Sequence, residues 1–196
     1  MKMKIATWNV NSINVRMPQL IDWLAAAQPD VLCVQETKTV DDGFPALQLK
    51  AAGYDAVFTG EKAYNGVAML SKFPINDVHV NLPGDDEGAP KRMISATING
   101  IRIVNTYVPN GSELWSDKYK FKLDWLQRLR KYFDETCNAN KDVLLCGDFN
   151  VAMEAIDHWN AADSEGKLHF SRPERAAMHY VKQFGFVDCY RKIHGD

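Results

Sequence analysis

The stretch at residues 143–150, VLLCGDFN, joins an apolar run to two polar side chains. Four apolar residues without alternation predict a strand buried on both faces, and Gly147 allows a sharp turn at its end. Asp148 and Asn150 are two residues apart, so in extended backbone their side chains point the same way. A carboxylate and a carboxamide at a rigid strand end can begin a catalytic site. Taken alone, a G-D-x-N segment more often closes a strand as an Asx-rich turn.

Three other predicted strands also end in polar side chains. These side chains are Asn9 and Asn11 at the carboxyl end of strand 4–9, Glu36 after strand 31–35, and Tyr107 at the end of strand 101–107. Each could separately be a turn residue, a solvated acid or a core aromatic. The repeated placement instead predicts that they converge with Asp148 and Asn150 on one cleft.

The chemistry of this set favours a hard metal ion. There is no Cys/His cluster of the kind that binds zinc, and no glycine-rich phosphate loop. Oxygen ligands with few carboxylates suit Mg²⁺, which keeps several waters and relies on substrate phosphate. Such a metal, a carboxylate base and neutral amide donors together fit the hydrolysis of a phosphate ester.

Composition indicates an ordinary globular protein. The chain has 196 residues, of which 46% are hydrophobic and 24% charged, and its net charge of -2 excludes a globally basic nucleic-acid binder. The four cysteines form no CxxC pair, which is typical of a reducing compartment. No signal peptide or membrane span is predicted, so we expect a cytoplasmic protein.

Hydrophobic patterns predict strands and helices in mixed order over one domain, residues 1–196. Asn99 and Gly100 between two β-branched runs predict a tight hairpin. Helix 117–136 carries an apolar stripe (Phe121, Trp125, Leu129 and Phe133), and we expect its Lys118, Lys122, Arg128, Arg130 and Lys131 to form a solvated face. The remaining predicted helices are 15–27, 45–52 and 173–184, and the remaining strands are 54–59, 67–71, 78–82 and 93–98. The mixture predicts an α/β sandwich of two packed mixed sheets with helices on the outer faces.

The segments TWNVNSI, VQETK, YNGVAMLSK, NTYVPNG, KFKLDWLQRLRKYF and CGDFNVA occur in the order seen in the exonuclease III family. The chain therefore resembles the abasic-site endonucleases of the endonuclease/exonuclease/phosphatase superfamily, over essentially its whole length. The resemblance implies a four-layer α/β sandwich of the deoxyribonuclease I-like kind. It also implies a DNA-repair nuclease that cuts the phosphodiester 5′ to abasic sites and removes nucleotides from 3′ ends.

The resemblance also implies roles for single residues. Glu36 would be the principal ligand of Mg²⁺ or Mn²⁺, in a metal site with Asn9, Asn11, Asp148 and Asn150. Tyr107 would contact the scissile phosphate, Asp148 would activate or relay the proton of the attacking water, and Asn150 would hold the transition state. Contacts to double-stranded DNA would come from Arg16, Lys38, Tyr64, Asn65, Arg92 and Asn160.

Two features depart from the family pattern. The terminal Ser-Asp-His motif does not occur before Asp196, so we expect the domain to be C-terminally incomplete and this piece alone to be poorly active. The arginine that some relatives place after YVPN is also absent. A lipid or small-molecule phosphoesterase of the same superfamily and a non-catalytic DNA-binding protein remain as alternatives. We expect a monomer.

Overall fold

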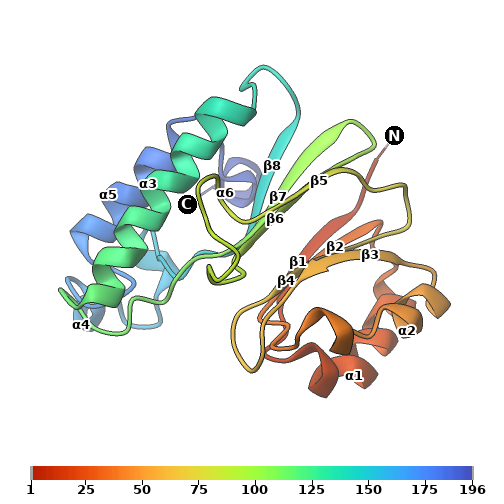
Figure 1. The fold of residues 1–196 in the computed structure, drawn as a ribbon. Helices are drawn as coiled ribbons and strands as arrows, with labels where there is room; N and C mark the ends of the chain where they lie inside the picture. The colour runs from red at the N-terminus through yellow and green to blue at the C-terminus, as the bar shows by residue number, and fades with distance from the viewer. Residues whose placement is uncertain (1, 196) are drawn as a thin grey trace. The chain divides into compact units, whose positions relative to one another are not determined.

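The computed structural model describes residues 2–195 and divides the chain into two compact units. The first unit comprises the chain up to Tyr107 together with Asp142–Asp148, and the second comprises Val108–Lys141 and the chain from Phe149 onward. Figure 1 labels the helices and strands of both. The expectation of a single domain stays a prediction.

The first unit contains two four-stranded sheets. The first has the order β1 (Ile5–Asn9), β2 (Val31–Gln35), β4 (Val67–Ser71) and β3 (Asp55–Thr59). The second has the order β5 (Asn76–Val80), β6 (Met93–Ile98), β7 (Ile101–Tyr107) and β8 (Val143–Asp148). β1 runs parallel to β2 and β7 parallel to β8, whereas the other pairs are antiparallel, so both sheets are mixed (Figure 1).

Strand β2 is buried on both faces, which explains its apolar sequence without alternation. Val31 and Cys33 pack in a core with β6 and β7 of the second sheet. Leu32 and Val34 point the other way, into a core with α1 (Ile13–Ala27) and α2 (Ala46–Ala51). In Figure 1 these two helices cover the outer face of the first sheet. A short 3₁₀ helix, Asp41–Gly43, lies between β2 and α2.

One buried polar cluster fixes the two sheets against each other. The Gln35 Nε2 donates to Asn105 Oδ1 at 2.6 Å, and the Asn105 Nδ2 donates to the carbonyls of Val34 and Ala68, both at 2.9 Å. Both side chains are almost completely buried, so their bonded amides specify one register between the sheets. Gln35 directly precedes Glu36, and Asn105 lies two residues before Tyr107. The Gln35–Asn105 cluster therefore helps to fix the positions of Glu36 and Tyr107, two of the predicted site residues.

Gly147 has a different role from the predicted turn. It lies inside β8, pairs with Thr106 of β7 and has φ of +135°. A Cβ atom at this position would lie 1.9 Å from the Thr106 carbonyl oxygen. Glycine is needed here because the two parallel strands approach closely and because the backbone conformation is strained for other residues.

Most of the predicted elements form within two residues of their expected ends, with β5 the clearest shift. The Asn99–Gly100 hairpin is confirmed, with both residues at positive φ and Ile98 paired with Ile101. The strand expected at 78–82 runs instead from Asn76 to Val80. Its pairing with β6 is irregular between Asn76 and His79, and Asn81 ends it with φ of +63°.

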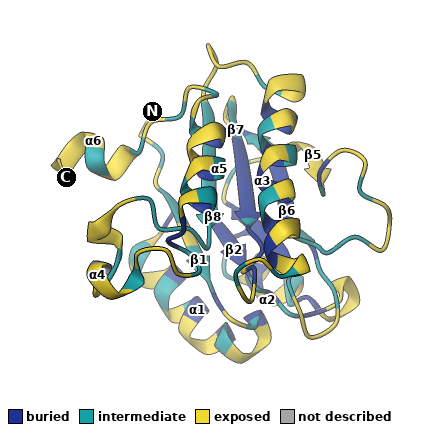
Figure 2. Ribbon diagram, turned by 90° about the vertical axis from the view of Figure 1, so that its left-hand side faces the viewer, coloured by how far each residue is buried: buried dark blue, intermediate teal, exposed yellow. Residues whose placement is uncertain are grey.

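The second unit is helical. Its elements are α3 (Asp117–Thr136), the 3₁₀ helix η2 (Ala155–Asp157), α4 (Ala161–Ser164), α5 (Arg172–Lys182) and α6 (Cys189–His194). α3 packs against α5. Ser116 caps α3, and Ser171 caps α5 in a capping box with Glu174. In Figure 2 most of α6 is exposed, whereas α3 and α5 each bury one side.

The face of α3 is only partly as predicted. Trp125, Leu129 and Phe133 are buried, but Phe121 is 38% exposed. Lys122, which was expected in a solvated face, is completely buried. The prediction for Lys122 was wrong because a charge can be buried when it has close partners, and spacing alone cannot show those partners.

Among residues 2–195 no helix is long and apolar enough to span a membrane.

Candidate active site

Four strand ends of the first unit meet at one place, as the sequence predicts. The Asn9 side chain, at the end of β1, donates to Glu36 Oε1 and to Asp148 Oδ2, both at 2.8 Å. Glu36 follows β2 and Asp148 ends β8, so one amide group joins acids that are far apart in the chain. The Tyr107 hydroxyl, at the end of β7, donates to the Glu36 carboxylate.

Glu36 is surrounded by donors. Besides Asn9 and Tyr107, the Lys38 ammonium lies 2.8 Å from Glu36 Oε2 and donates to Asn11 Oδ1 at 2.5 Å. Burial raises the pKa of Glu36, but the hydrogen bonds from Asn9, Lys38 and Tyr107 outweigh it and hold the pKa below its usual value. Glu36 therefore stays ionised and can present negative charge to a cation.

The Tyr107 hydroxyl is held in its protonated form. Burial and the bond to Glu36 raise its pKa to about 12. The Arg92 guanidinium lies 4.8 Å from the centre of the Tyr107 ring and donates to the Tyr107 carbonyl at 3.3 Å. Tyr107 can thus act as a hydrogen-bond donor at neutral pH, beside a fixed positive charge.

The backbone of this site is strained at four residues. Positive φ angles, which cost a non-glycine residue about 1–3 kcal/mol, occur at Asn11 (+44°), Ser12 (+88°), Glu36 (+55°) and Lys38 (+53°). Backbone bonds hold the two segments together, since Ser12 donates to the Glu36 carbonyl at 2.7 Å and Ile13 to the Thr37 carbonyl at 3.1 Å. Such strain is typical of functional sites, where it fixes the direction of a side chain.

The acids and amides at this place can hold a hard divalent ion. Glu36 and Asp148 supply carboxylate oxygens, and among residues 2–195 no group of three or more His, Cys, Asp or Glu is placed to hold a metal ion. An ion bound here would complete its shell with water and substrate oxygens, as Mg²⁺ commonly does. Asn9 presents its nitrogen to the acids, and its Oδ1 accepts from the Asn11 backbone at 3.1 Å.

Asn150 belongs to the second unit and has its own partners there. Its side-chain nitrogen donates to the Val108 carbonyl at 3.0 Å, and its Oδ1 accepts from the Asn110 amide at 3.4 Å. Its φ is +48°, so its backbone is strained like that of Glu36. Val108 and Asn110 belong to the YVPNG segment and Asn150 belongs to GDFN. These hydrogen bonds therefore join the two motifs within the second unit.

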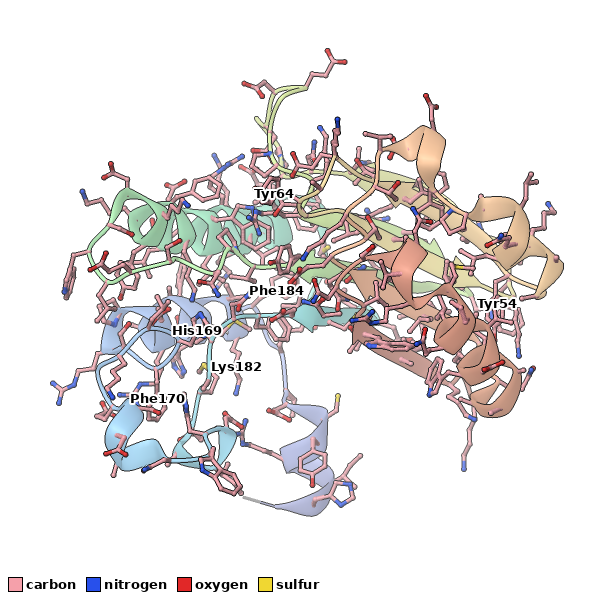
Figure 3. All side chains as sticks on the ribbon, turned by 90° about the horizontal axis from the view of Figure 1, so that it is seen from below. Tyr54, Tyr64, His169, Phe170, Lys182 and Phe184 are labelled. Atoms are coloured by element: carbon pink, nitrogen blue, oxygen red, sulfur yellow. The ribbon has the colours of Figure 1, made fainter. Side chains whose placement is uncertain are left out.

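Four of the six residues predicted to bind DNA lie in loops that backbone hydrogen bonds connect. In the first unit, Lys38 donates through its backbone to the Asn65 carbonyl at 3.0 Å, and the neighbouring Gly66 donates to the Lys91 carbonyl at 2.9 Å. These two backbone bonds connect the loop of Asn65 to the loop of Lys38 on one side and to the segment before Arg92 on the other. Tyr64, labelled in Figure 3, is 72% exposed in the same loop as Asn65.

The two remaining candidates are placed separately. Arg16 is half-buried in the first turns of α1, and its backbone donates to the Ser12 carbonyl at 3.2 Å. Asn160, in the second unit, donates to Asp163 at 2.5 Å next to α4. Asn160 is exposed.

Sequence reasoning missed Lys122 and Glu174, which form a completely buried ion pair in the second unit. Lys122 also donates to the backbone carbonyls of Asn110 and Asn150. The only hint in the sequence was the capping-box spacing of Ser171 and Glu174 before an apolar helix face. That spacing predicts a helix start and gives no sign of the lysine.

The fold and the site define an α/β sandwich with an acidic, amide-lined cluster at its strand ends, as in phosphoesterases. The model of the Endonuclease/Exonuclease/phosphatase family matches residues 6–189, and the chain belongs to this family. It is 30% identical over 196 residues to an exodeoxyribonuclease of Bacillus subtilis, covering 99% of this chain and 77% of that protein.

Two solved structures match the chain over its full length. An AP endonuclease from Archaeoglobus fulgidus is 41% identical with a TM-score of 0.95, and a 3′ phosphatase from Neisseria, bound to a product DNA hairpin, is 38% identical with a TM-score of 0.94. This chain covers 76% of each. The predicted deoxyribonuclease I-like fold class, a four-layer α/β sandwich, is confirmed by these similarities.

Proposed function

We propose that this protein is a DNA-repair nuclease that hydrolyses the phosphodiester 5′ to abasic sites and removes nucleotides from 3′ ends. The observation that carries the proposal is the joining of Glu36 and Asp148 through Asn9 at the strand ends of a nuclease-family fold. Relatives named as an exodeoxyribonuclease, an AP endonuclease and a 3′ phosphatase bound to DNA support DNA as the substrate.

The family depends on divalent metal, and we propose Mg²⁺ as the ion for this protein, with Mn²⁺ as a substitute. Glu36 would hold it, with Asp148, Asn9, Asn11 and Asn150 as the remaining candidate ligands. When bound, the ion supplies positive charge that offsets the charge on the phosphate. Glu36 is suited to this role because its lowered pKa keeps it ionised.

The remaining steps use side chains of this chain. Asp148, oriented by Asn9, accepts or relays the proton of the attacking water. When a phosphate is bound, the Tyr107 hydroxyl turns its one hydrogen bond from Glu36 to a phosphate oxygen, and its raised pKa keeps it protonated for that role. Asn150 stabilises the developing negative charge through its amide. The loops with Lys38, Tyr64, Asn65 and Arg92 contact DNA phosphates, together with Arg16 and Asn160.

The test compares four substrates with the protein as its gene encodes it. They are a duplex with one abasic site, an intact duplex with a recessed 3′ end, a duplex with a 3′ phosphate, and an inositol phosphate. We expect incision at the abasic site in Mg²⁺ or Mn²⁺ and none in chelator. Turnover of the inositol phosphate without incision of DNA would contradict the proposal. DNA binding with no turnover of any substrate would make the protein a binder instead.

We also propose that the protein is monomeric and works in the cytoplasm. The state of its cysteines supports the second part: Cys33 and Cys146 are thiols that share a hydrogen bond in the core of the first unit, as is usual in a reducing compartment. Size-exclusion chromatography with light scattering tests the first part, and imaging of the tagged protein tests the second.

A further inference from the structure

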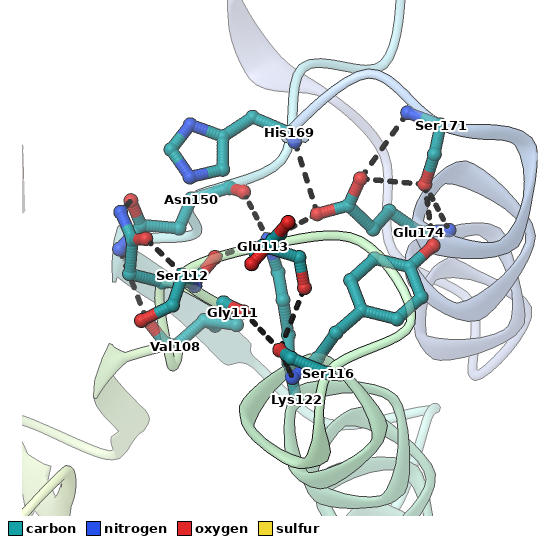
Figure 4. Close-up of polar contacts among 12 residues, drawn as sticks. Val108, Gly111, Ser112, Glu113, Ser116, Lys122, Asn150, His169, Ser171 and Glu174 are labelled. Carbon is teal, nitrogen blue, oxygen red and sulfur yellow. Dashed lines mark hydrogen bonds and ion pairs between the residues drawn. The ribbon is translucent and has the colours of Figure 1, made fainter. Parts of the chain in front are cut away.

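Lys122 is a charged side chain in the interior of the second unit. Its ammonium lies 2.5 Å from Glu174 Oε1, 2.6 Å from the Asn150 carbonyl and 3.1 Å from the Asn110 carbonyl (Figure 4). Neither Lys122 nor Glu174 has any exposed side-chain surface. Burying an ammonium is costly unless each of its three donors is used, and these three contacts use them.

Glu174 is itself fixed in place from the start of α5. Its Oε1 accepts from the His169 backbone at 3.0 Å, and its Oε2 accepts from the Ser171 backbone at 3.2 Å and the Ser171 hydroxyl at 2.6 Å. The Tyr119 hydroxyl lies 2.6 Å from the same hydroxyl oxygen. Figure 4 shows this network on one side of Lys122. The Glu174 carboxylate is therefore held in one position, and it holds the Lys122 ammonium within hydrogen-bond distance of the Asn110 and Asn150 carbonyls.

The two loops that Lys122 joins carry the recognised motifs. Asn110 lies in YVPNG and Asn150 in GDFN, and their side chains share a hydrogen bond of 3.4 Å. Lys122 bonds the backbone carbonyl of each residue, and Asn150 sits at a strained φ of +48°. A bond to the backbone at a strained residue fixes the peptide plane and with it the direction of the side chain.

We propose that the Lys122–Glu174 pair is a positioning pair that sets the direction of the Asn150 amide. This inference rests on the proposed function, in which Asn150 stabilises the transition state. Neither residue of the pair touches substrate. They act through the carbonyls of Asn110 and Asn150, and a small displacement of a transition-state contact is enough to lower the rate about a hundredfold.

The ion pair of Lys122 and Glu174 matters more for the position of the loops at Asn110 and Asn150 than for the stability of the fold. An apolar pair of similar volume often stabilises a core as well as a buried ion pair does. An apolar side chain at position 122, however, cannot donate to the carbonyls of Asn110 and Asn150. Stability and catalysis can therefore be separated by replacing one partner or both.

The experiment compares K122M, the double variant K122M/E174Q and K122R. K118M is the control, because Lys118 is an exposed lysine one turn earlier on the same helix. Urea unfolding and the kcat and KM for an abasic duplex in Mg²⁺ are measured for each. We expect K122M to lose stability, since Glu174 keeps a buried charge without its cation. In the double variant stability returns in large part, kcat stays about tenfold or more below wild type, and KM changes by less than about threefold. K122R should recover part of kcat.

Recovery of kcat together with stability in K122M/E174Q would overturn the positioning role. A second readout does not depend on activity: the side-chain amide signals of Asn150 in a ¹H–¹⁵N spectrum, assigned from their loss in N150D. We expect them to shift in the folded double variant and to stay unchanged in K118M. Unchanged signals in the double variant would overturn the inference even if wild type proved inactive on abasic DNA. Such inactivity would instead count against the proposed function.

Discussion

At the scale of single residues, the site depends on how Asn9 is oriented. Its nitrogen donates to Glu36 and Asp148, and its oxygen accepts from the Asn11 backbone. The amide therefore separates two carboxylates that would otherwise repel each other. Asn11, Ser12, Glu36 and Lys38 have positive φ, and backbone hydrogen bonds between the two segments maintain this conformation. Only the types and spacing of these residues could be predicted from sequence, because their hydrogen bonds join distant segments.

Asp148→Asn should abolish incision of an abasic duplex while it leaves DNA binding nearly unchanged. The substitution keeps the shape of the side chain but removes the carboxylate that we propose takes the proton, and such groups commonly contribute about 100- to 10,000-fold to the rate. Single-turnover incision and fluorescence-anisotropy binding measure the two effects. If incision and binding fall by the same factor, Asp148 is a structural residue.

At the scale of elements, close approach of β7 and β8 sets the position of Asp148. Gly147 pairs with Thr106 and directly precedes Asp148, and Tyr107 is paired with Asp148 across the same ladder. The buried Gln35–Asn105 pair gives a second constraint, between the two sheets. The apolar runs of these strands predicted the strands themselves. Their mutual approach could not be predicted, because pairing between strands about 40 residues apart leaves no local pattern.

Gly147→Ala should destabilise the first unit by more than about 3 kcal/mol, since the new Cβ would meet a backbone oxygen that cannot move away alone. Gly100→Ala is the matched control. Gly100 also has positive φ but has no atom within 4 Å of an added Cβ, so its cost is the conformational one of about 1–2 kcal/mol. Urea unfolding gives both values. Equal losses at the two positions would show that the strand contact carries no extra cost.

A second element-scale prediction concerns pH and the turn before η2. Asp157 accepts from the backbones of Met153 and Glu154 and pairs with Arg191 of α6 at 2.7 Å. Burial raises the pKa of Asp157, but these bonds outweigh it and lower the pKa, and the backbone and side chain of Arg191 lower the pKa of Asp188. Both acids therefore contribute stability above the unfolded pKa of about 3.9, and that stability is lost as pH falls through their lower folded values.

We expect the Met153 and Glu154 amides to keep their protection from hydrogen exchange at pH above the unfolded pKa of about 3.9, and to lose it as pH falls through the lower folded pKa of Asp157. NMR-detected exchange in wild type and Asp157→Asn measures the effect, and the variant should show weak protection with little pH dependence. Protection in wild type that persists unchanged through the acid range would contradict this role for Asp157.

At the scale of the whole molecule, sequence reasoning identified the family, the fold class and the strand ends that meet at the candidate site. The order of the motifs along the chain identified the family. GDFN and QETK identified the site, because each motif contains polar residues at the end of a strand. The same reasoning placed Lys122 on a solvated face, and the structure shows it completely buried. Helical spacing alone cannot distinguish an exposed lysine from one paired with Glu174, which lies 52 residues further along the chain.

The central claim is that Glu36 is the main protein ligand of the ion that assists hydrolysis. The Mg²⁺ dependence of incision at an abasic site, in wild type and Glu36→Gln, tests it most directly. We expect the variant to need at least about tenfold more Mg²⁺ for half-maximal incision, since a neutral amide replaces the carboxylate. The exposed Glu87→Gln should behave as wild type. The same Mg²⁺ requirement in Glu36→Gln and wild type would contradict the account.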